Sequence, residues 1–225
     1  MSPSRLETIE IETAPAPTAS VIWLHGLGAD GNDFAPIVPQ IDLGGVAVRY
    51  VFPNAPAIPV TVNNGYVMPA WYDISDAAIR REDEPGVRAS QAAIEALIAH
   101  EKSRGIPALR IVLAGFSQGG AIALHTGLRH AERLAGIMAL SAYVPVADKL
   151  AAEGHAMNRD LPVFMAHGRD DTVIPLGRAM QSRVLLEQQG YALEWHEYRM
   201  PHSVCPEEIG DIAVWLKKVL GPGTH

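Results

Sequence analysis

Cysteine is nearly absent from this 225-residue sequence, in which Cys205 is the only one. A single thiol cannot form an intrachain disulfide, so nothing points to an oxidising compartment. The N-terminal segment also lacks the basic head, apolar run and small-residue cleavage site of a secretory signal. These absences together predict a cytoplasmic protein.

Positive charge and long apolar runs are scarce as well. The chain has 18 Lys and Arg against 25 Asp and Glu, a formal net charge of −7, and no basic cluster. This balance argues against a nucleic-acid partner. No apolar run approaches the roughly 18 residues of a membrane span, which argues against stable membrane insertion. The sequence leaves the oligomeric state open.

The length and composition fit one globular domain. Hydrophobic residues make up 48% of the chain, and no repeat, low-complexity tract or Pro- or Ser-rich linker divides it. We therefore expect a single domain over residues 1–225, large enough to bury a substantial core.

Short runs rich in Val, Ile and Leu alternate with helical patterns along the chain. Such an alternation predicts an α/β fold with a mostly parallel central sheet and helices on both faces. We expect buried strands within residues 21–25, 46–52, 109–116, 134–141 and 161–168, and a further strand that contains His196. We expect helices within residues 87–105, 118–130, 176–190 and 206–221.

One long stretch, from Asn54 to about Pro85, has no regular pattern and contains the segment VMPAWYDI. Loops of this length in compact domains are usually functional or disordered, and the aromatic pair Trp71 and Tyr72 favours an ordered loop that lines a pocket. Core packing is an equally good explanation of the two rings. Trp71 and Tyr72 are therefore candidates for substrate binding, with core packing as the alternative.

The segment GFSQG, residues 115–119, has the G-x-S-x-G pattern between a predicted strand and a predicted helix. In this context the pattern indicates a nucleophile elbow, a tight turn that exposes the Ser117 hydroxyl above the sheet. The backbone N–H of Gln118, at the start of the helix, points to where an oxyanion would form. Taken alone, Ser117 could instead be an ordinary helix N-cap.

A serine nucleophile needs a histidine base and a carboxylate that orients the histidine. In α/β-hydrolases these follow the serine in the order acid, then histidine. The segment HGRDDTVIP, which follows a predicted strand, offers Asp170 and Asp171, either of which could also be a turn residue. The loop before the final helix carries His202, which alone among the nine histidines has the expected context.

The segment HGLGADG, residues 25–31, allows two interpretations. It contains the G-x-G-x-x-G spacing of dinucleotide-binding folds, yet a His-Gly pair after a strand can also begin an oxyanion loop. A dinucleotide fold would continue into an uninterrupted helix and place an acidic residue after the next strand. Pro36 and Pro39 interrupt the following segment, and the next strand ends in VFPN, so we favour the oxyanion loop.

The sequence resembles, over nearly its whole length, the carboxylesterase and phospholipase family that includes the acyl-protein thioesterases. The matching segments are HGLGADGNDF, MPAWYDI, GFSQGG, the HGxxDxxxP pattern at 167–175 and the PH at 201–202. The resemblance implies the α/β-hydrolase fold and selects Asp171 over Asp170 as the acid. It also implies an oxyanion hole made by the backbone N–H groups of Leu27 and Gln118.

We expect a serine carboxylesterase in which Ser117 attacks, His202 moves the proton and Asp171 orients the histidine, without a metal or organic cofactor. The absence of a large apolar insertion that could form a lid favours short and medium acyl esters. Two alternatives with the same catalytic residues are an acyl-protein thioesterase and a lysophospholipase. A catalytically silent α/β-hydrolase that serves as a binding module is the non-enzymatic alternative, and it would be expected to carry a broken triad.

Overall fold

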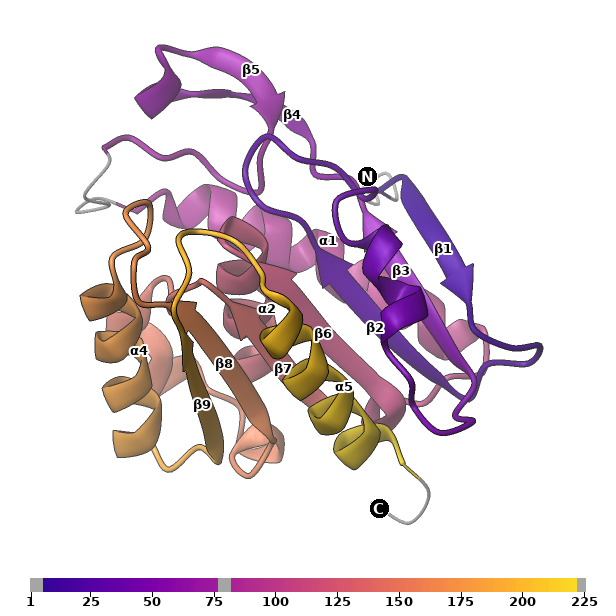
Figure 1. The fold of residues 1–225 in the computed structure, drawn as a ribbon. Helices are drawn as coiled ribbons and strands as arrows, with labels where there is room; N and C mark the ends of the chain where they lie inside the picture. The colour runs from indigo at the N-terminus through magenta and orange to yellow at the C-terminus, as the bar shows by residue number, and fades with distance from the viewer. Residues whose placement is uncertain (1–5, 77–81, 222–225) are drawn as a thin grey trace.

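A computed structural model describes residues 6–76 and 82–221, which form a seven-stranded sheet with helices on both faces (Figure 1). The strand order is β1-β3-β2-β6-β7-β8-β9, and every neighbouring pair is parallel except β1 with β3. The strands of this sheet are β1 Thr8–Glu12, β2 Ala19–Leu24, β3 Val48–Pro53, β6 Ile111–Phe116, β7 Gly136–Leu140, β8 Val163–Gly168 and β9 Leu193–Tyr198. The expected mostly parallel α/β architecture is confirmed, and the described residues form no large lid.

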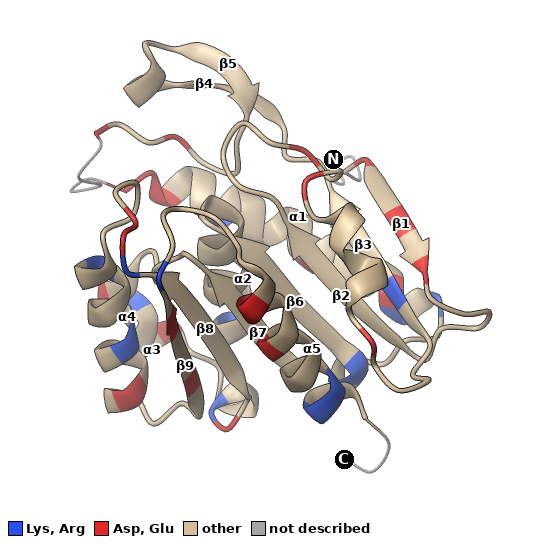
Figure 2. Ribbon diagram, in the orientation of Figure 1, with Lys and Arg blue, Asp and Glu red and all other residues tan. Residues whose placement is uncertain are grey.

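The helices form two layers around this sheet. In the view of Figure 1, α1 and α2 lie behind the sheet and α5 lies in front of it. The α-helices are α1 Glu84–Ser103, α2 Gln118–Arg129, α3 Leu150–Glu153, α4 Leu176–Gln188 and α5 Pro206–Leu220. Acidic residues begin α5 and basic residues end it, as Figure 2 shows, an arrangement that complements the helix dipole.

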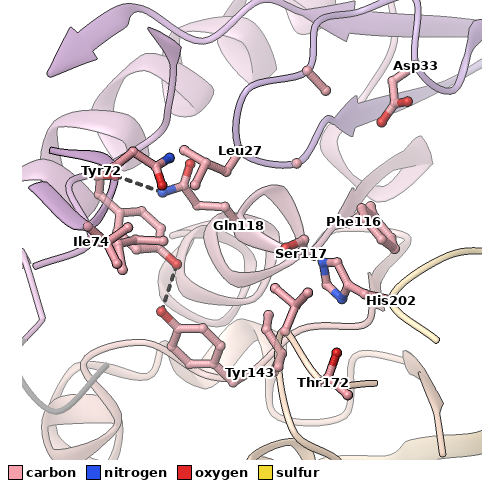
Figure 3. A pocket seen from close by; sticks show the side chains of 16 residues that line it. Leu27, Asp33, Tyr72, Ile74, Phe116, Ser117, Gln118, Tyr143, Thr172 and His202 are labelled. Atoms are coloured by element: carbon pink, nitrogen blue, oxygen red, sulfur yellow. Dashed lines mark hydrogen bonds between the residues drawn. The ribbon is translucent and has the colours of Figure 1, made fainter. Parts of the chain in front are cut away.

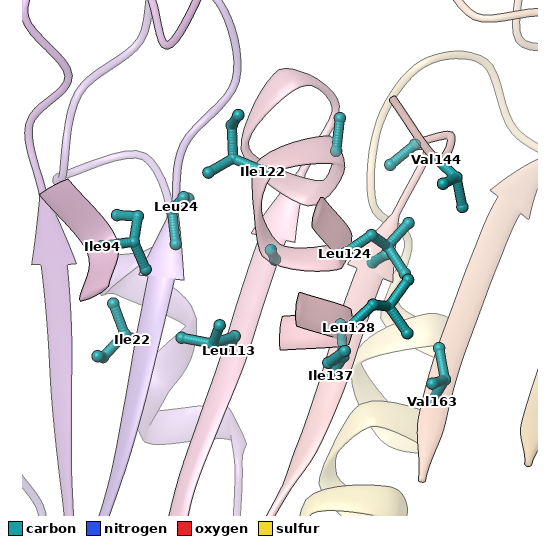
Figure 4. Close-up of a cluster of buried hydrophobic side chains, with 14 of the residues drawn as sticks. Ile22, Leu24, Ile94, Leu113, Ile122, Leu124, Leu128, Ile137, Val144 and Val163 are labelled. Carbon is teal, nitrogen blue, oxygen red and sulfur yellow. The ribbon is translucent and has the colours of Figure 1, made fainter. Parts of the chain in front are cut away.

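The strand side chains alternate between two buried clusters because successive residues of a strand face opposite sides of the sheet. Ile22 and Leu113 belong to the cluster under α1 and α2, whereas Trp23 and Val112 belong to the cluster under α5. Figure 4 shows the first cluster, in which Ile122 and other α2 side chains lie against the strands. Strands buried on both faces explain the continuous apolar runs of the sequence.

Two parts of the fold differ from the sequence-based expectation. The edge strand β1 pairs antiparallel with β3 and was not expected. The stretch 54–85 is not irregular throughout, because β4 Ala57–Val60 and β5 Tyr66–Pro69 pair as an antiparallel hairpin. The connection over residues 61–65 ends with Asn64 and Gly65, whose positive φ angles of 56° and 74° turn the chain back into β5. Residues 77–81 of that stretch lie outside the described residues.

Leu113 in β6 and Leu109 in the short turn before this strand provide a test of the core. Leu113, in the centre of β6, is fully buried, whereas Leu109 before the strand is 38% exposed. Leu113→Ala should lower the free energy of unfolding by about 2–5 kcal/mol, because a cavity remains in a closely packed site. Leu109→Ala should change it by less than about 1 kcal/mol. Urea denaturation measures both values, and equal losses would contradict the assigned packing.

Candidate active site

The turn between β6 and α2 presents Ser117 at the carboxyl edge of the sheet. Ser117 has φ 55° and ψ −121°, a conformation that is strained for a residue with a side chain. The turn is tight enough that a Cβ at Gly115 would lie 2.3 Å from the carbonyl carbon of Gly119. A Cβ at Gly119 would lie 2.4 Å from the Leu24 carbonyl oxygen. Only glycine fits these two positions, as the G-x-S-x-G pattern predicts.

Ser117, His202 and Asp171 lie in one hydrogen-bonded line. His202 Nε2 is 2.9 Å from Ser117 Oγ, and His202 Nδ1 is 2.7 Å from Asp171 Oδ2. When Nδ1 carries the proton and donates it to the carboxylate, Nε2 is left as the acceptor for the serine hydroxyl. The ring of Phe116 packs against His202 with centroids 4.7 Å apart, which restricts the imidazole from the side.

The turn after β8 holds the Asp171 carboxylate in a fixed orientation. Asp171 Oδ1 accepts hydrogen bonds from the backbone N–H groups of Val173 and Ile174, both at 2.9 Å. His167 Nε2 donates to the Ile174 carbonyl at 2.8 Å and lies 3.4 Å from Asp171 Oδ2. Burial lowers the pKa of His167, which favours the neutral ring. Asp170, the other candidate, is exposed to solvent.

The two residues whose backbone N–H groups are expected to bind an oxyanion both line the cavity that contains Ser117. The Leu27 N–H donates to no acceptor in the part of the chain that the structure describes. Gln118 is the first residue of α2, where an N–H has no acceptor within its own helix. Both residues line the cavity beside Ser117, as Figure 3 shows. The glycine segment itself leads into a six-residue 3-10 helix, Ala35–Gln40, rather than the α-helix of a dinucleotide fold.

A cavity of about 500 Å³ opens at Ser117. Its walls come from the loop after β2, the hairpin, the 72–74 segment and the turn after β8, and they are mainly apolar. Tyr72 lines this cavity, whereas Trp71 does not, although both side chains are buried. The described residues contain no group of three or more His, Cys, Asp or Glu arranged to hold a metal ion. Nor do they include a helix long and apolar enough to cross a membrane.

Two phenol groups that line the cavity contact each other. The hydroxyls of Tyr72 and Tyr143 are 2.8 Å apart, and Figure 3 shows them pointing toward each other. Burial raises the pKa of both tyrosines, that of Tyr72 well above its ordinary value. Both phenols therefore remain neutral, although charged groups lie close by: the Arg178 guanidinium is 4.0 Å from the centre of the Tyr143 ring, and the charge of Glu82 also acts on both tyrosines.

Several residues of the site were not expected from the sequence. The attachment of His25 and His167 to the site could not be deduced from the sequence. Tyr143 was not identified, because no motif surrounds it. The side chain of Gln118 was also missed, although its amide donates to the Tyr72 carbonyl at 2.7 Å and accepts from the Trp71 N–H at 2.8 Å.

The helix that follows the His202 loop begins with a buried acid. Glu208 is fully buried in the first turn of α5. Burial raises the pKa of its carboxyl to about 8, the charge of Asp211 acts in the same direction, and the Cys205 backbone N–H opposes them. Glu208 is therefore protonated in the folded protein at neutral pH, next to a loop whose geometry positions the histidine.

Comparison with known proteins identifies one family over most of the chain. The phospholipase/carboxylesterase family matches residues 6–220. The chain is 42% identical over 218 residues to acyl-protein thioesterase 1 of Neurospora crassa, which covers 90% of this chain and 87% of that protein. It is 38% identical over 237 residues to the protein of the same name from Gibberella zeae, with 99% of each chain covered.

Solved structures agree with this relationship. The structure of Arabidopsis thaliana SOBER1 superimposes with a TM-score of 0.85 at 29% identity, covering 90% of this chain and 99% of that one. Zea mays acyl-protein thioesterase 2 superimposes with a TM-score of 0.86 at 25% identity, covering 96% and 100%. The fold is therefore shared over almost the whole length of these proteins.

Exchanging each carboxylate of the turn after β8 tests which one orients His202. Asp171→Asn should lower kcat by up to about 10⁴-fold, because an amide in that position favours the wrong histidine tautomer. Asp170→Asn is the matched control and should change kcat by less than about threefold, since its side chain is exposed. Steady-state kinetics on folded variants measure both kcat values. A larger loss of kcat in Asp170→Asn than in Asp171→Asn would make Asp170 the residue that orients His202.

Stability as a function of pH tests the buried Glu208. The unfolded carboxyl loses its proton near its ordinary pKa of 4.5 and the folded one near 8, so the folded state holds an extra proton between these values. The free energy of unfolding should therefore fall as the pH rises through this window. The glutamine of Glu208→Gln cannot ionise. At pH 8 the free energy of unfolding of this variant should exceed that of wild type by on the order of 1–3 kcal/mol, and at pH 4 the two values should be similar.

Glu207→Gln is the matched control, because Glu207 lies in the same helical turn but is exposed. Its unfolding curves, recorded with denaturant from pH 4 to pH 9, should follow those of wild type. Parallel pH profiles for Glu208→Gln and wild type would show that Glu208 ionises at its ordinary pKa in the folded protein.

Proposed function

The chain belongs to the phospholipase/carboxylesterase family of α/β-hydrolases and is a serine hydrolase, and from this premise we propose that it cleaves acyl thioesters and esters through an acyl-enzyme. The observation that carries the proposal is the line from Ser117 through His202 to Asp171, with distances of 2.9 and 2.7 Å. A catalytically silent binding module would not need this alignment.

In the proposed reaction, Ser117 Oγ attacks the acyl carbonyl carbon while His202 Nε2 takes the hydroxyl proton. The carbonyl oxygen becomes an oxyanion that accepts hydrogen bonds from the N–H groups of Leu27 and Gln118. His202 then donates its proton to the departing sulfur or oxygen as the bond to the acyl carbon breaks. Water, deprotonated by His202, attacks the acyl-enzyme, and the carboxylic acid leaves as Ser117 regains its proton.

The leaving group and the acyl group occupy different sides of Ser117 in this proposal. The leaving atom must lie beside His202, which protonates it, so the acyl chain extends toward Leu27, Tyr72 and Tyr143. Figure 3 shows His202 on one side of Ser117 and the other three side chains on the opposite side. The mainly apolar walls of the cavity suit an aliphatic acyl chain.

The names of related proteins support a thioester as the substrate more strongly than an oxygen ester. Fungal proteins 37–42% identical to this chain are named acyl-protein thioesterase 1. A cavity of about 500 Å³ supports our expectation of short and medium acyl groups. The proposal also includes a cytoplasmic setting, which is supported by the single cysteine.

Matched S-acyl and O-acyl substrates with the same acyl chain test the proposal. We expect a larger kcat/KM for the thioester, by about tenfold or more, because a thiolate, with a pKa near 8.5, leaves readily. Ser117→Ala should lower the hydrolysis of both by at least about 10⁴-fold and abolish labelling by a fluorophosphonate. Ser103→Ala, at the exposed end of α1, is the control and should retain both activities. Hydrolysis that survives in Ser117→Ala would refute the proposed nucleophile.

A further inference from the structure

The two proposed oxyanion donors come from segments that are far apart in the sequence. Leu27 lies in the loop after β2, and Gln118 is the first residue of α2. A transition-state oxyanion needs both donors at 2.7–3.1 Å at once, so their relative position must be fixed before the substrate arrives. A third segment, Pro69–Tyr72, makes hydrogen bonds to the loop on either side of Leu27 and to the Gln118 side chain.

The hydrogen bonds to the Leu27 loop lie on both sides of Leu27. Before it, the indole Nε1–H of Trp71 donates to the His25 carbonyl at 2.9 Å. After it, the N–H of Gly28 donates to the Pro69 carbonyl at 2.8 Å. The loop is thus attached to the Pro69–Tyr72 segment two residues before Leu27 and one residue after it.

The hydrogen bonds to Gln118 use its side chain and leave its backbone N–H for the cavity. Its Oε1 accepts from the Trp71 N–H at 2.8 Å, and its Nε2 donates to the Tyr72 carbonyl at 2.7 Å. The side chain is 2% exposed, so these bonds form without competition from water. Because the Gln118 amide accepts one hydrogen bond from this segment and donates another to it, the position and the orientation of the segment relative to α2 are both fixed.

Both the backbone and the ring of Trp71 are fixed by neighbouring residues. Its ring is 2% exposed and does not line the catalytic cavity, and the Ser90 hydroxyl of α1 donates to the Trp71 carbonyl. The ring also packs against His25, with centroids 5.3 Å apart. Trp71 therefore contacts both donor segments and has no face toward the substrate.

We infer that Trp71 and the Gln118 side chain are positioning residues that set the distance between the two oxyanion donors. This inference rests on the proposed function, because it assigns a purpose to donors that the proposed reaction uses. It replaces the candidate substrate-binding role of Trp71 with an indirect one. It also gives the Gln118 side chain a role separate from that of its backbone N–H.

Trp71→Phe tests the inference, because it keeps an aromatic ring and removes the indole N–H. The freed loop should shift, and kcat should fall about tenfold, which is less than the 10²- to 10³-fold typical of losing a donor outright. KM should stay within about twofold, because ground-state contacts are kept. An alkylboronic acid, which forms a tetrahedral adduct with the serine, should bind about tenfold more weakly.

Trp23→Phe is the matched control. Trp23 is 1% exposed, and its indole N–H has no hydrogen-bond partner among the described residues, so the exchange removes ring volume without removing a hydrogen bond. This variant should lose thermal stability but keep the kcat and the boronic acid affinity of wild type. We expect both variants to lose thermal stability, but only Trp71→Phe to lose kcat and boronic acid affinity. If Trp71 served only to stabilise the fold, the two variants would behave alike.

A second variant, Gln118→Met, disturbs the other donor and keeps the test decisive if Trp71→Phe does not fold. It should also lower kcat and boronic acid affinity together, with KM nearly unchanged. Wild-type kcat and boronic acid affinity in either folded variant would overturn the inference. A higher KM with unchanged kcat in Trp71→Phe would also overturn it and return Trp71 to a substrate-binding role.

Fluorophosphonate labelling separates this inference from the proposed function. A wild-type protein that is not labelled at Ser117 would refute the proposed function, and the positioning role with it. Labelled Ser117 in wild type, combined with unaltered kinetics in Trp71→Phe, would refute the positioning role alone.

Discussion

The close contact between the start of α2 and the end of β2 is the constraint on which the site depends. A side chain at Gly119 would overlap the carbonyl of Leu24, the last residue of β2. This contact places Ser117 beside the loop that continues from β2 and carries Leu27. Two donors from distant parts of the sequence therefore reach one cavity because glycine lets a helix lie against a strand end.

Two buried histidines stabilise the loops at this edge of the sheet in the same way. His25 ends the run from β2 and donates from Nδ1 to the Gly26 carbonyl at 2.7 Å, while its Nε2 accepts from the Ala55 N–H. His167, near the end of β8, donates to the Ile174 carbonyl. Burial lowers the pKa of both rings, so each stays neutral and keeps one donor and one acceptor. The loop with Leu27 and the turn with Asp171 are thus both fixed without adding a charge near Ser117.

Features with strong local signals were predictable from the sequence, and features that depend on pairing between distant segments were not. Apolar runs located the buried strands because burial on both faces requires them. β1 was missed because its sequence TIEIE alternates and lies at an edge, where only pairing with β3 specifies it. The hairpin in the stretch 54–85 was missed because Pro59 and the turn residues conceal two short strands.

The same distinction holds within the site. The elbow carries its own glycines, so Ser117 was identifiable from five residues, and chain order indicated His202 and a nearby acid. Choosing Asp171 over Asp170 needed the resemblance, since adjacent aspartates in a turn look alike in sequence; in the structure one is buried against His202 and the other is exposed. For Trp71, the sequence shows an aromatic residue in a loop. Whether such a ring faces a substrate or holds a neighbouring segment depends on tertiary contacts alone.

The leaving group determines how strongly catalysis depends on these contacts. An alkoxide is a poor leaving group, because an alcohol ionises near the pKa of water, about 16, so ester cleavage needs proton donation from His202 as the bond breaks. A thiolate, with a pKa near 8.5, leaves with much less assistance. For a thioester the main demand on the protein is therefore to stabilise the oxyanion as Ser117 attacks. In that case the spacing of the Leu27 and Gln118 N–H groups, and so the segment from Pro69 to Tyr72 that fixes it, contributes more to the rate than the proton transfer to the leaving atom.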